Sequence, residues 1–106
     1  MIFQTKQHNT RNAFKAMLYE PNGELLNLTD CEVLFRMQSK EGLVIDRAMQ
    51  IVGNGEVILV FAPEEVANKG IFLAEITVIF PDGRKEFYPS EGYIKVYINS
   101  SLGGNQ

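Results

Sequence analysis

The sequence predicts an all-β protein, a β-sandwich of about seven short strands with one helical turn. Apolar and polar residues alternate with a period of two through most segments, which is typical of strands with one buried face. Clusters of Gly, Pro, Asn and Asp interrupt these segments at spacings of about 8–12 residues. A length of 106 residues fits one domain, and a hydrophobic fraction of 45% is that of a globular protein.

The first third of the chain predicts an arm followed by two strands. Residues 1–11 are polar and unpatterned, so we expect a flexible N-terminal arm. Residues 12–20 alternate, and Pro-Asn-Gly at 21–23 makes a turn, because proline presets φ and glycine accepts the left-handed conformation. Residues 31–38 form the second strand, and the single cysteine, Cys31, is expected to be buried and unreactive on its inward face.

The middle of the chain predicts two strands and a helical corner. Residues 43–52 form a less regular strand, and a Gly-Asn-Gly turn leads into a strand at 57–61. In the segment 63–68, Pro63 suits the first position of a helical turn, and the two glutamates after it suit the positive end of that turn.

The strongest pattern lies in residues 71–80, where every second residue from Phe72 is apolar and is expected to face the core. The next residues, Pro-Asp-Gly, predict a type I turn closed by a left-handed glycine. We therefore interpret the charged tip as a solvated hairpin bend and not as a chemical site; its residues are Asp82, Arg84 and Lys85.

The last part of the chain predicts two strand segments, 84–89 and 93–98. A helical corner before a long strand, followed by a tight hairpin, resembles the corner of an immunoglobulin-like sandwich. Phe72 stands where that fold often has a tyrosine, and the chain has neither a cysteine pair nor a tryptophan. We expect an Ig-like topology over residues 12–98, without a true immunoglobulin domain, and a flexible tail or linker over 99–106.

Composition argues against several functional classes. The formal net charge of −3 predicts no nucleic-acid partner, since phosphates require a basic face. The longest unbroken apolar run, residues 57–63, is far shorter than the roughly 20 residues of a membrane span, so we expect no membrane partner. A lone His8 and a lone Cys31 supply neither a metal site nor a nucleophile with its base. We expect no catalytic residue, no metal and no cofactor.

The outward faces of the predicted strands carry more apolar residues than an isolated monomer needs. Several of them on one sheet face would form a patch, and such patches usually mark partners. The alternative is that the faces of some strands are misassigned. The interface candidates are Ile71, Leu73, Ile79, Tyr93 and Tyr97, with further outward residues at Met17, Leu34, Ile58 and Val60.

The order of several segments within residues 13–98 carries a family resemblance. These segments are "LLNLT", "CEVLFRM", "GEVILVF", "PEEV", "KGIF" and "FPDGRKEFYPSEGY". Their order resembles the N-terminal domain of phage baseplate upper proteins, from tailed phages and prophages of Gram-positive bacteria. In that family such domains attach the upper baseplate to the tail core.

The resemblance implies an Ig-like sandwich, no enzymatic activity, protein partners in the baseplate or tail, and often a trimeric assembly. It implies a location in the virion tail after synthesis in the bacterial cytoplasm, and it transfers no site residues. The chain ends soon after the domain, so we expect it to lack the downstream region that holds receptor-binding proteins in that family, either as a fragment or as a short relative with a different role.

Two functions of different classes follow from these observations. The first is a structural module of a phage or prophage baseplate, which attaches the host-recognition apparatus to the tail by protein–protein contacts. The alternative is a carbohydrate-binding module in host-surface recognition, carried by exposed tyrosines such as Tyr93 and Tyr97. An enzyme is a distant third.

Overall fold

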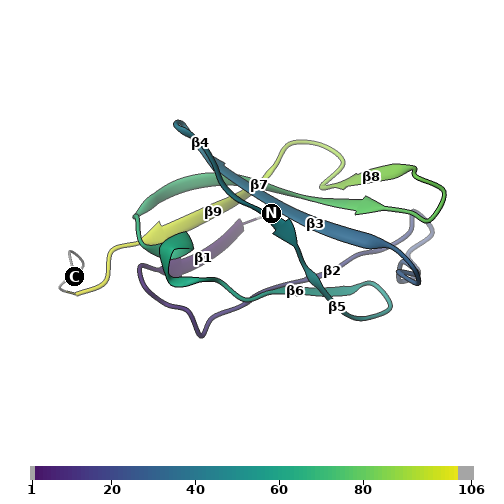
Figure 1. The fold of residues 1–106 in the computed structure, drawn as a ribbon, viewed down its shortest axis with the longest axis horizontal. Helices are drawn as coiled ribbons and strands as arrows, with labels where there is room; N and C mark the ends of the chain where they lie inside the picture. The colour runs from purple at the N-terminus through teal and green to yellow at the C-terminus, as the bar shows by residue number, and fades with distance from the viewer. Residues whose placement is uncertain (1, 103–106) are drawn as a thin grey trace.

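A computed structural model describes residues 2–102 and consists almost entirely of strands. Two sheets face each other across one core, so the predicted all-β sandwich is confirmed (Figure 1). The molecule is elongated along the strands, with extents of 46 × 25 × 21 Å. Within the described residues, no helix is long and apolar enough to cross a membrane.

The large sheet contains six strands in the order β1-β9-β7-β3-β4, and β8 pairs with the far part of β7. Among residues 2–102, β1 and β9 pair in parallel, and the other pairs of this sheet are antiparallel. The strands are β1 (Ile2–Lys6), β3 (Glu32–Ser39), β4 (Gly42–Ala48), β7 (Gly70–Ile79), β8 (Lys85–Tyr88) and β9 (Ile94–Asn99).

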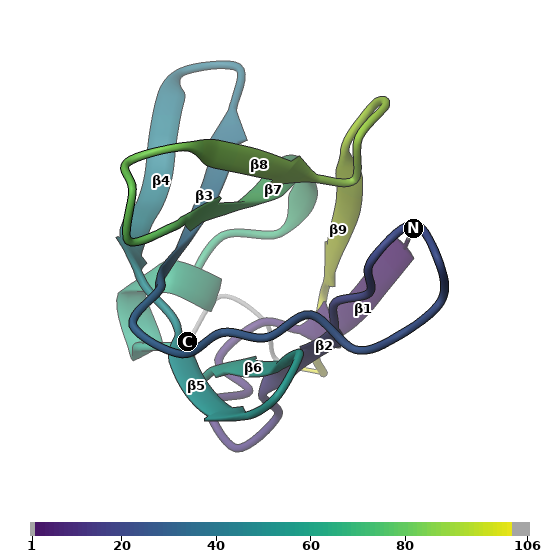
Figure 2. The same ribbon diagram turned by 90° about the vertical axis from the view of Figure 1, so that its right-hand side faces the viewer.

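The small sheet contains three antiparallel strands in the order β2-β6-β5. They are β2 (Phe14–Met17), β5 (Gln50–Gly53) and β6 (Glu56–Leu59). In the view of Figure 2 these strands lie below β3, β4, β7 and β8. A 3-10 turn, η1 (Pro63–Val66), connects β6 of the small sheet to β7 of the large sheet and confirms the predicted helical corner.

The strand order is that of an immunoglobulin-like sandwich. Strands β2, β6 and β5 take the places of strands B, E and D, and β3, β7 and β9 take those of C, F and G. Strand β4 adds a further member beside C, as in variable-type domains, and β1 pairs with the last strand.

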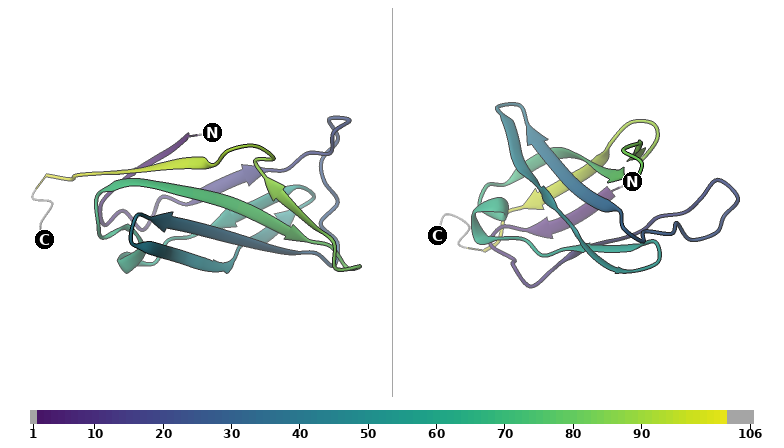
Figure 3. Two further views of the ribbon diagram at one scale, coloured as in Figure 1. Left: turned by 90° about the horizontal axis from the view of Figure 1, so that it is seen from above. Right: turned by 45° about the vertical axis from the view of Figure 1, so that its right-hand side comes forward.

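One extended segment belongs to both sheets. Strand β4 pairs with β3 in the large sheet, and β5 pairs with β6 in the small sheet, with only Met49 between them (Figure 3). Met49 is buried, and its backbone N–H donates to the carbonyl of Val33 over 2.8 Å. The segment predicted as one irregular strand, 43–52, is therefore two strands that meet at this crossing.

The core lies between the sheets and follows the predicted alternation. On β7 the even-numbered residues Phe72, Ala74, Ile76 and Val78 are all buried against the small sheet. Because the side-chain period of a strand is two, the odd-numbered residues point away from the core. We call the side of the large sheet that faces away from the small sheet the outer face.

The expectation of a flexible arm over residues 1–11 is wrong for residues 2–6, which form strand β1. Phe3 packs its ring against Phe14 and Phe61 at centroid distances of 5.2 and 5.9 Å. Thr5 is buried beside it, and the backbone N–H of His8 donates to the carbonyl of Val66 over 2.9 Å. The alternation in this strand is weak because one of its two inward residues, the threonine, is polar.

The predicted flexible tail or linker over residues 99–106 begins one residue too early. Asn99, which falls within the predicted tail or linker, is the last residue of β9. Residues 103–106 of that predicted tail lie outside the described residues.

Candidate interaction surface on the large sheet

The five predicted interface candidates all lie outside the core. Ile71 is 64% exposed and Tyr93 is 51% exposed. Leu73, Ile79 and Tyr97 are half-buried. The odd-numbered positions of β7 therefore point outward, as the alternation predicted.

The register brings some of these candidates together and separates others. Ile71 lies directly opposite Tyr97 in the ladder between β7 and β9. Ile79 sits eight residues further along β7, about 27 Å away at the rise of an extended strand. There it is flanked by Glu32 and Lys85, so it does not belong to the same apolar cluster.

Two outer-face residues escaped the sequence analysis as interface candidates. Phe87 on β8 is 44% exposed and lies opposite Thr77 of β7. Glu75 lies on the same face and is half-buried, with Arg36 of β3 as its cross-strand neighbour. The alternation placed Glu75 outward, but its neighbours depend on strand pairing, which no local pattern specifies.

Two hollows indent the outer face on either side of Tyr93 and Glu75, which line both. The first has a volume of about 420 Å³ and lies toward β4. The second has a volume of about 390 Å³ and lies toward β8. The remaining lining residues are Arg36, Gln38, Leu43, Asp46, Leu73 and Ala74 in the first, and Phe87, Pro89, Ser90 and Gly92 in the second.

The charges of the first hollow are two carboxylates and one guanidinium. Nε of Arg36 donates to Oδ1 of Asp46 over 3.1 Å, and both side chains are a little under half exposed. Glu75 forms no ion pair within 4 Å with any residue in 2–102. The charged residues that line this hollow therefore sum to one net negative charge, and Tyr93 lines the same hollow.

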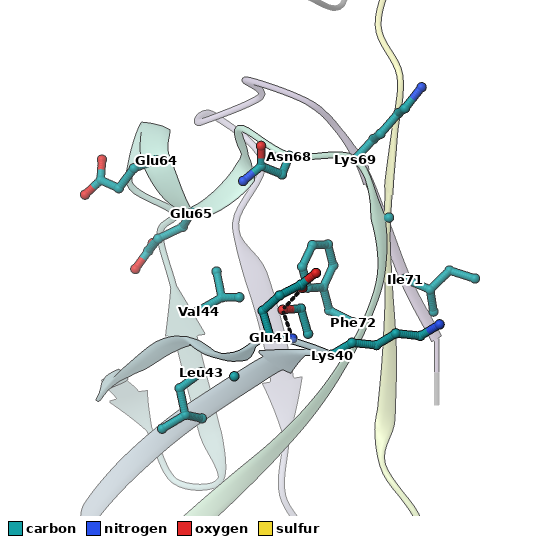
Figure 4. A pocket seen from close by; sticks show the side chains of 13 residues that line it. Lys40, Glu41, Leu43, Val44, Glu64, Glu65, Asn68, Lys69, Ile71 and Phe72 are labelled. Carbon is teal, nitrogen blue, oxygen red and sulfur yellow. Dashed lines mark hydrogen bonds between the residues drawn. The ribbon is translucent and has the colours of Figure 1, made fainter.

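A third hollow, of about 690 Å³, lies at the end of the sandwich between the β3–β4 hairpin and the corner that follows η1 (Figure 4). Glu64 and Lys69 point away from its centre, and the carboxylate of Glu41 accepts a hydrogen bond from the hydroxyl of Ser39 over 3.0 Å. The residues that line it include both acidic and basic side chains but no nucleophile with a base beside it, so we assign no chemistry to this hollow.

An ion pair beside this hollow connects β4 to η1. Arg47 donates twice to the carboxylate of Glu65, from Nε to Oε2 over 2.8 Å and from Nη2 to Oε1 over 2.7 Å. The same carboxylate accepts the backbone N–H of Ala62 over 2.7 Å, and Nη2 also donates to the carbonyl of Val60 over 2.6 Å.

The Glu65 side chain is only 10% exposed. Burial acts to raise the pKa of Glu65, but the hydrogen bonds from Arg47 and Ala62 outweigh it, so this pKa lies below its ordinary value. The ion pair has a structural role, because its hydrogen bonds join β4 to η1 and to the backbone between β6 and η1.

The hairpin tip has the predicted turn geometry. Gly83 has a φ of +88°, and its N–H donates to the carbonyl of Phe80 over 2.8 Å. Asp82 accepts the backbone N–H of Arg84 over 3.0 Å and its Nε over 2.7 Å. Lys85 is exposed beside them, so the tip is a solvated bend whose carboxylate holds the turn.

Cys31 is half-buried, which corrects the expectation of full burial. It packs against the core from the residue before β3, and its thiol lies 3.9 Å from the carbonyl oxygen of Asn27. Burial, followed by the nearby charges of Asp30 and Asp82, raises the pKa of the thiol. A raised pKa lowers the thiolate fraction at neutral pH and with it the reactivity.

His8 is exposed, and residues 2–102 contain no group of three or more His, Cys, Asp or Glu side chains arranged to hold a metal ion. Comparison with protein-family models, with curated proteins and with solved structures found no match to this chain.

Proposed function

We propose that this domain is a structural module of a phage or prophage tail baseplate that attaches the host-recognition apparatus to the tail by protein–protein contacts. The sequence resemblance over residues 13–98 supports the class, and the Ig-like sandwich agrees with the fold that this resemblance implies. The partners are other baseplate or tail proteins, together with further copies of this chain.

The observation that carries the proposal is the outer face of the large sheet. Tyr93 and Phe87 are 51% and 44% exposed on it and line the hollows around Glu75. Ile71, which is 64% exposed, lies further along β7 on the same face. Burial of apolar surface contributes about 25 cal/mol per Å², so a protein partner that covers these side chains gains affinity. Clusters of exposed apolar side chains on one face are characteristic of interaction surfaces.

A carbohydrate-binding module is the second candidate. Tyr93 exposes half of its side chain next to the amide and carboxylate groups of Gln38 and Glu75, and aromatic rings beside hydrogen-bonding groups suit sugars. A glycan array separates the two candidates. Specific glycan binding that is abolished by Tyr93→Ala would favour the carbohydrate function over the baseplate function.

The direct experiment combines genome context with reconstitution. The gene is expected beside tail, tape-measure or lysis genes, and the protein is expected to form a complex when co-expressed with the products of the neighbouring tail genes. Complex formation is measured by size-exclusion chromatography with light scattering.

Leu73→Asp is expected to leave the fold intact and to abolish the complex, because this side chain points away from the core. Val52→Asp is the matched control, since Val52 is 55% exposed on the small sheet. A gene outside any phage cluster, together with no complex, would overturn the proposal. Complexes that survive both Leu73→Asp and Ile71→Asp would show that the partner binds elsewhere.

A further inference from the structure

We infer that the hollows around Glu75 and Tyr93 bind a basic side chain, arginine or lysine, of the partner protein. The inference rests on the proposed function for the partner being a protein. It goes further by naming the chemical group that the outer face recognises.

The carboxylate of Glu75 lies in the large sheet and forms no ion pair within 4 Å among residues 2–102. Glu75 is half-buried on β7, and its cross-strand neighbour Arg36 directs its Nε to Asp46 instead. A partner that covers Glu75 would remove water from its carboxylate, which is unfavourable unless the partner supplies a cation. A cationic group on the partner relieves this cost and adds a charge-assisted hydrogen bond.

The walls of the hollow suit the rest of a basic side chain. Leu43 and Leu73 line it, and they offer apolar contact to the methylene stem of an arginine or lysine. Tyr93 is 51% exposed and lines the same hollow as Glu75, so its ring offers an aromatic surface to a cation bound in the hollow. Arginine fits this combination best, because its planar group can stack on a ring and bind a carboxylate with two hydrogen bonds.

The surrounding charges do not supply the missing cation. Lys95 lies opposite Leu73 on β9 and is the nearest other basic residue in the register, but it lines neither hollow and forms no ion pair within the described residues. Two carboxylates against one guanidinium leave the first hollow negative, which disfavours a phosphate or a carboxylate as the ligand.

The test is an NMR titration of the 15N-labelled 106-residue protein with two blocked pentapeptides. One is Gly-Leu-Arg-Leu-Gly, and the other replaces arginine by citrulline, which is nearly the same shape without the charge. We expect shifts of the backbone amides of Leu73, Glu75 and Tyr93, and binding about tenfold weaker for the citrulline peptide. Added salt should narrow that difference.

Glu75→Gln is expected to abolish the preference for arginine, and Glu32→Gln is the matched control. Glu32 is an exposed carboxylate on the same face, opposite Ile79. Glu32→Gln is expected to leave the preference for the arginine peptide unchanged. Equal binding of both peptides, or a preference that survives Glu75→Gln, would overturn the inference. Shifts at the same amides with a chitin oligosaccharide, and none with either peptide, would instead identify a sugar site.

The titration needs no tail protein, so its failure is distinct from failure of the proposed function. If the preference for arginine is absent while Leu73→Asp still abolishes a tail complex, the inference is wrong and the proposed function stands. If the preference is present and no tail protein binds, the hollow recognises a basic group in a partner of another kind.

Discussion

Thr77→Val is expected to stabilise the protein by about 1–2 kcal/mol. Thr77 belongs to the outer face, yet it is only 2% exposed because Leu34 and Phe87 flank it on the neighbouring strands. Its Oγ1 atom is buried and has no hydrogen-bond partner. A buried, unsatisfied hydroxyl costs about 1–3 kcal/mol, and valine keeps the β-branched shape while removing that group.

Urea unfolding measures the effect, with the transition midpoint moving up at an unchanged slope. The melting temperature should rise by about 4–8 °C for each kcal/mol gained. Thr5→Val is the matched control, because Thr5 is also buried but its Oγ1 accepts a hydrogen bond from Nδ2 of Asn12 over 3.3 Å. We expect this variant to lose stability. A Thr77→Val protein no more stable than the wild type would refute the reasoning, and a gain in both variants would show that the hydrogen-bond status of the hydroxyl is irrelevant.

Three further predictions concern the core, the corner and the thiol. Ile76→Ala should cost roughly 2–5 kcal/mol in urea unfolding, whereas Ile71→Ala, at an exposed site, should change stability by less than about 0.5 kcal/mol. Glu65→Gln should cost about 1–2 kcal/mol at neutral pH. Folding lowers the pKa of Glu65 from its ordinary value of 4.5. The contribution of the ionised carboxylate to stability is therefore complete above that value and is lost as the pH falls through the folded pKa. The difference in free energy of unfolding between the variant and the wild type should shrink as the pH is lowered. Cys31 should react with a water-soluble thiol reagent more slowly in the folded protein than in urea.

Local chemistry accounts for what the sequence predicted well. The strands predicted at 31–38 and 71–80 differ by one residue at each end from β3 and β7, because continuous alternation gives a strong signal over that length. Proline, aspartate and glycine in fixed order also specified the hairpin tip around Asp82. These features depend only on neighbours in the chain.

Features that depend on distant partners were harder to predict. Strand β1 is held by Phe3 and by a parallel ladder to β9, more than 90 residues away. The change of sheet at Met49 depends on pairing with two different strands, β3 and β6, which no local pattern encodes. The site shows the same limit, since the placing of Phe87 beside Glu75 and Tyr93 follows from the register of β8 and β9 against β7.

The parallel pairing of β1 and β9 has a mechanical consequence. Five register positions, from Ile2 opposite Lys95 to Lys6 opposite Asn99, link these strands side by side. A pulling force between Ile2 and Leu102 draws β1 and β9 in opposite directions along their shared axis, so the ladder is loaded in shear at all five positions together. Strands peeled apart from one end would break one pair at a time. The sandwich should therefore resist tension between these two points more strongly than tension applied across the β3–β4 hairpin.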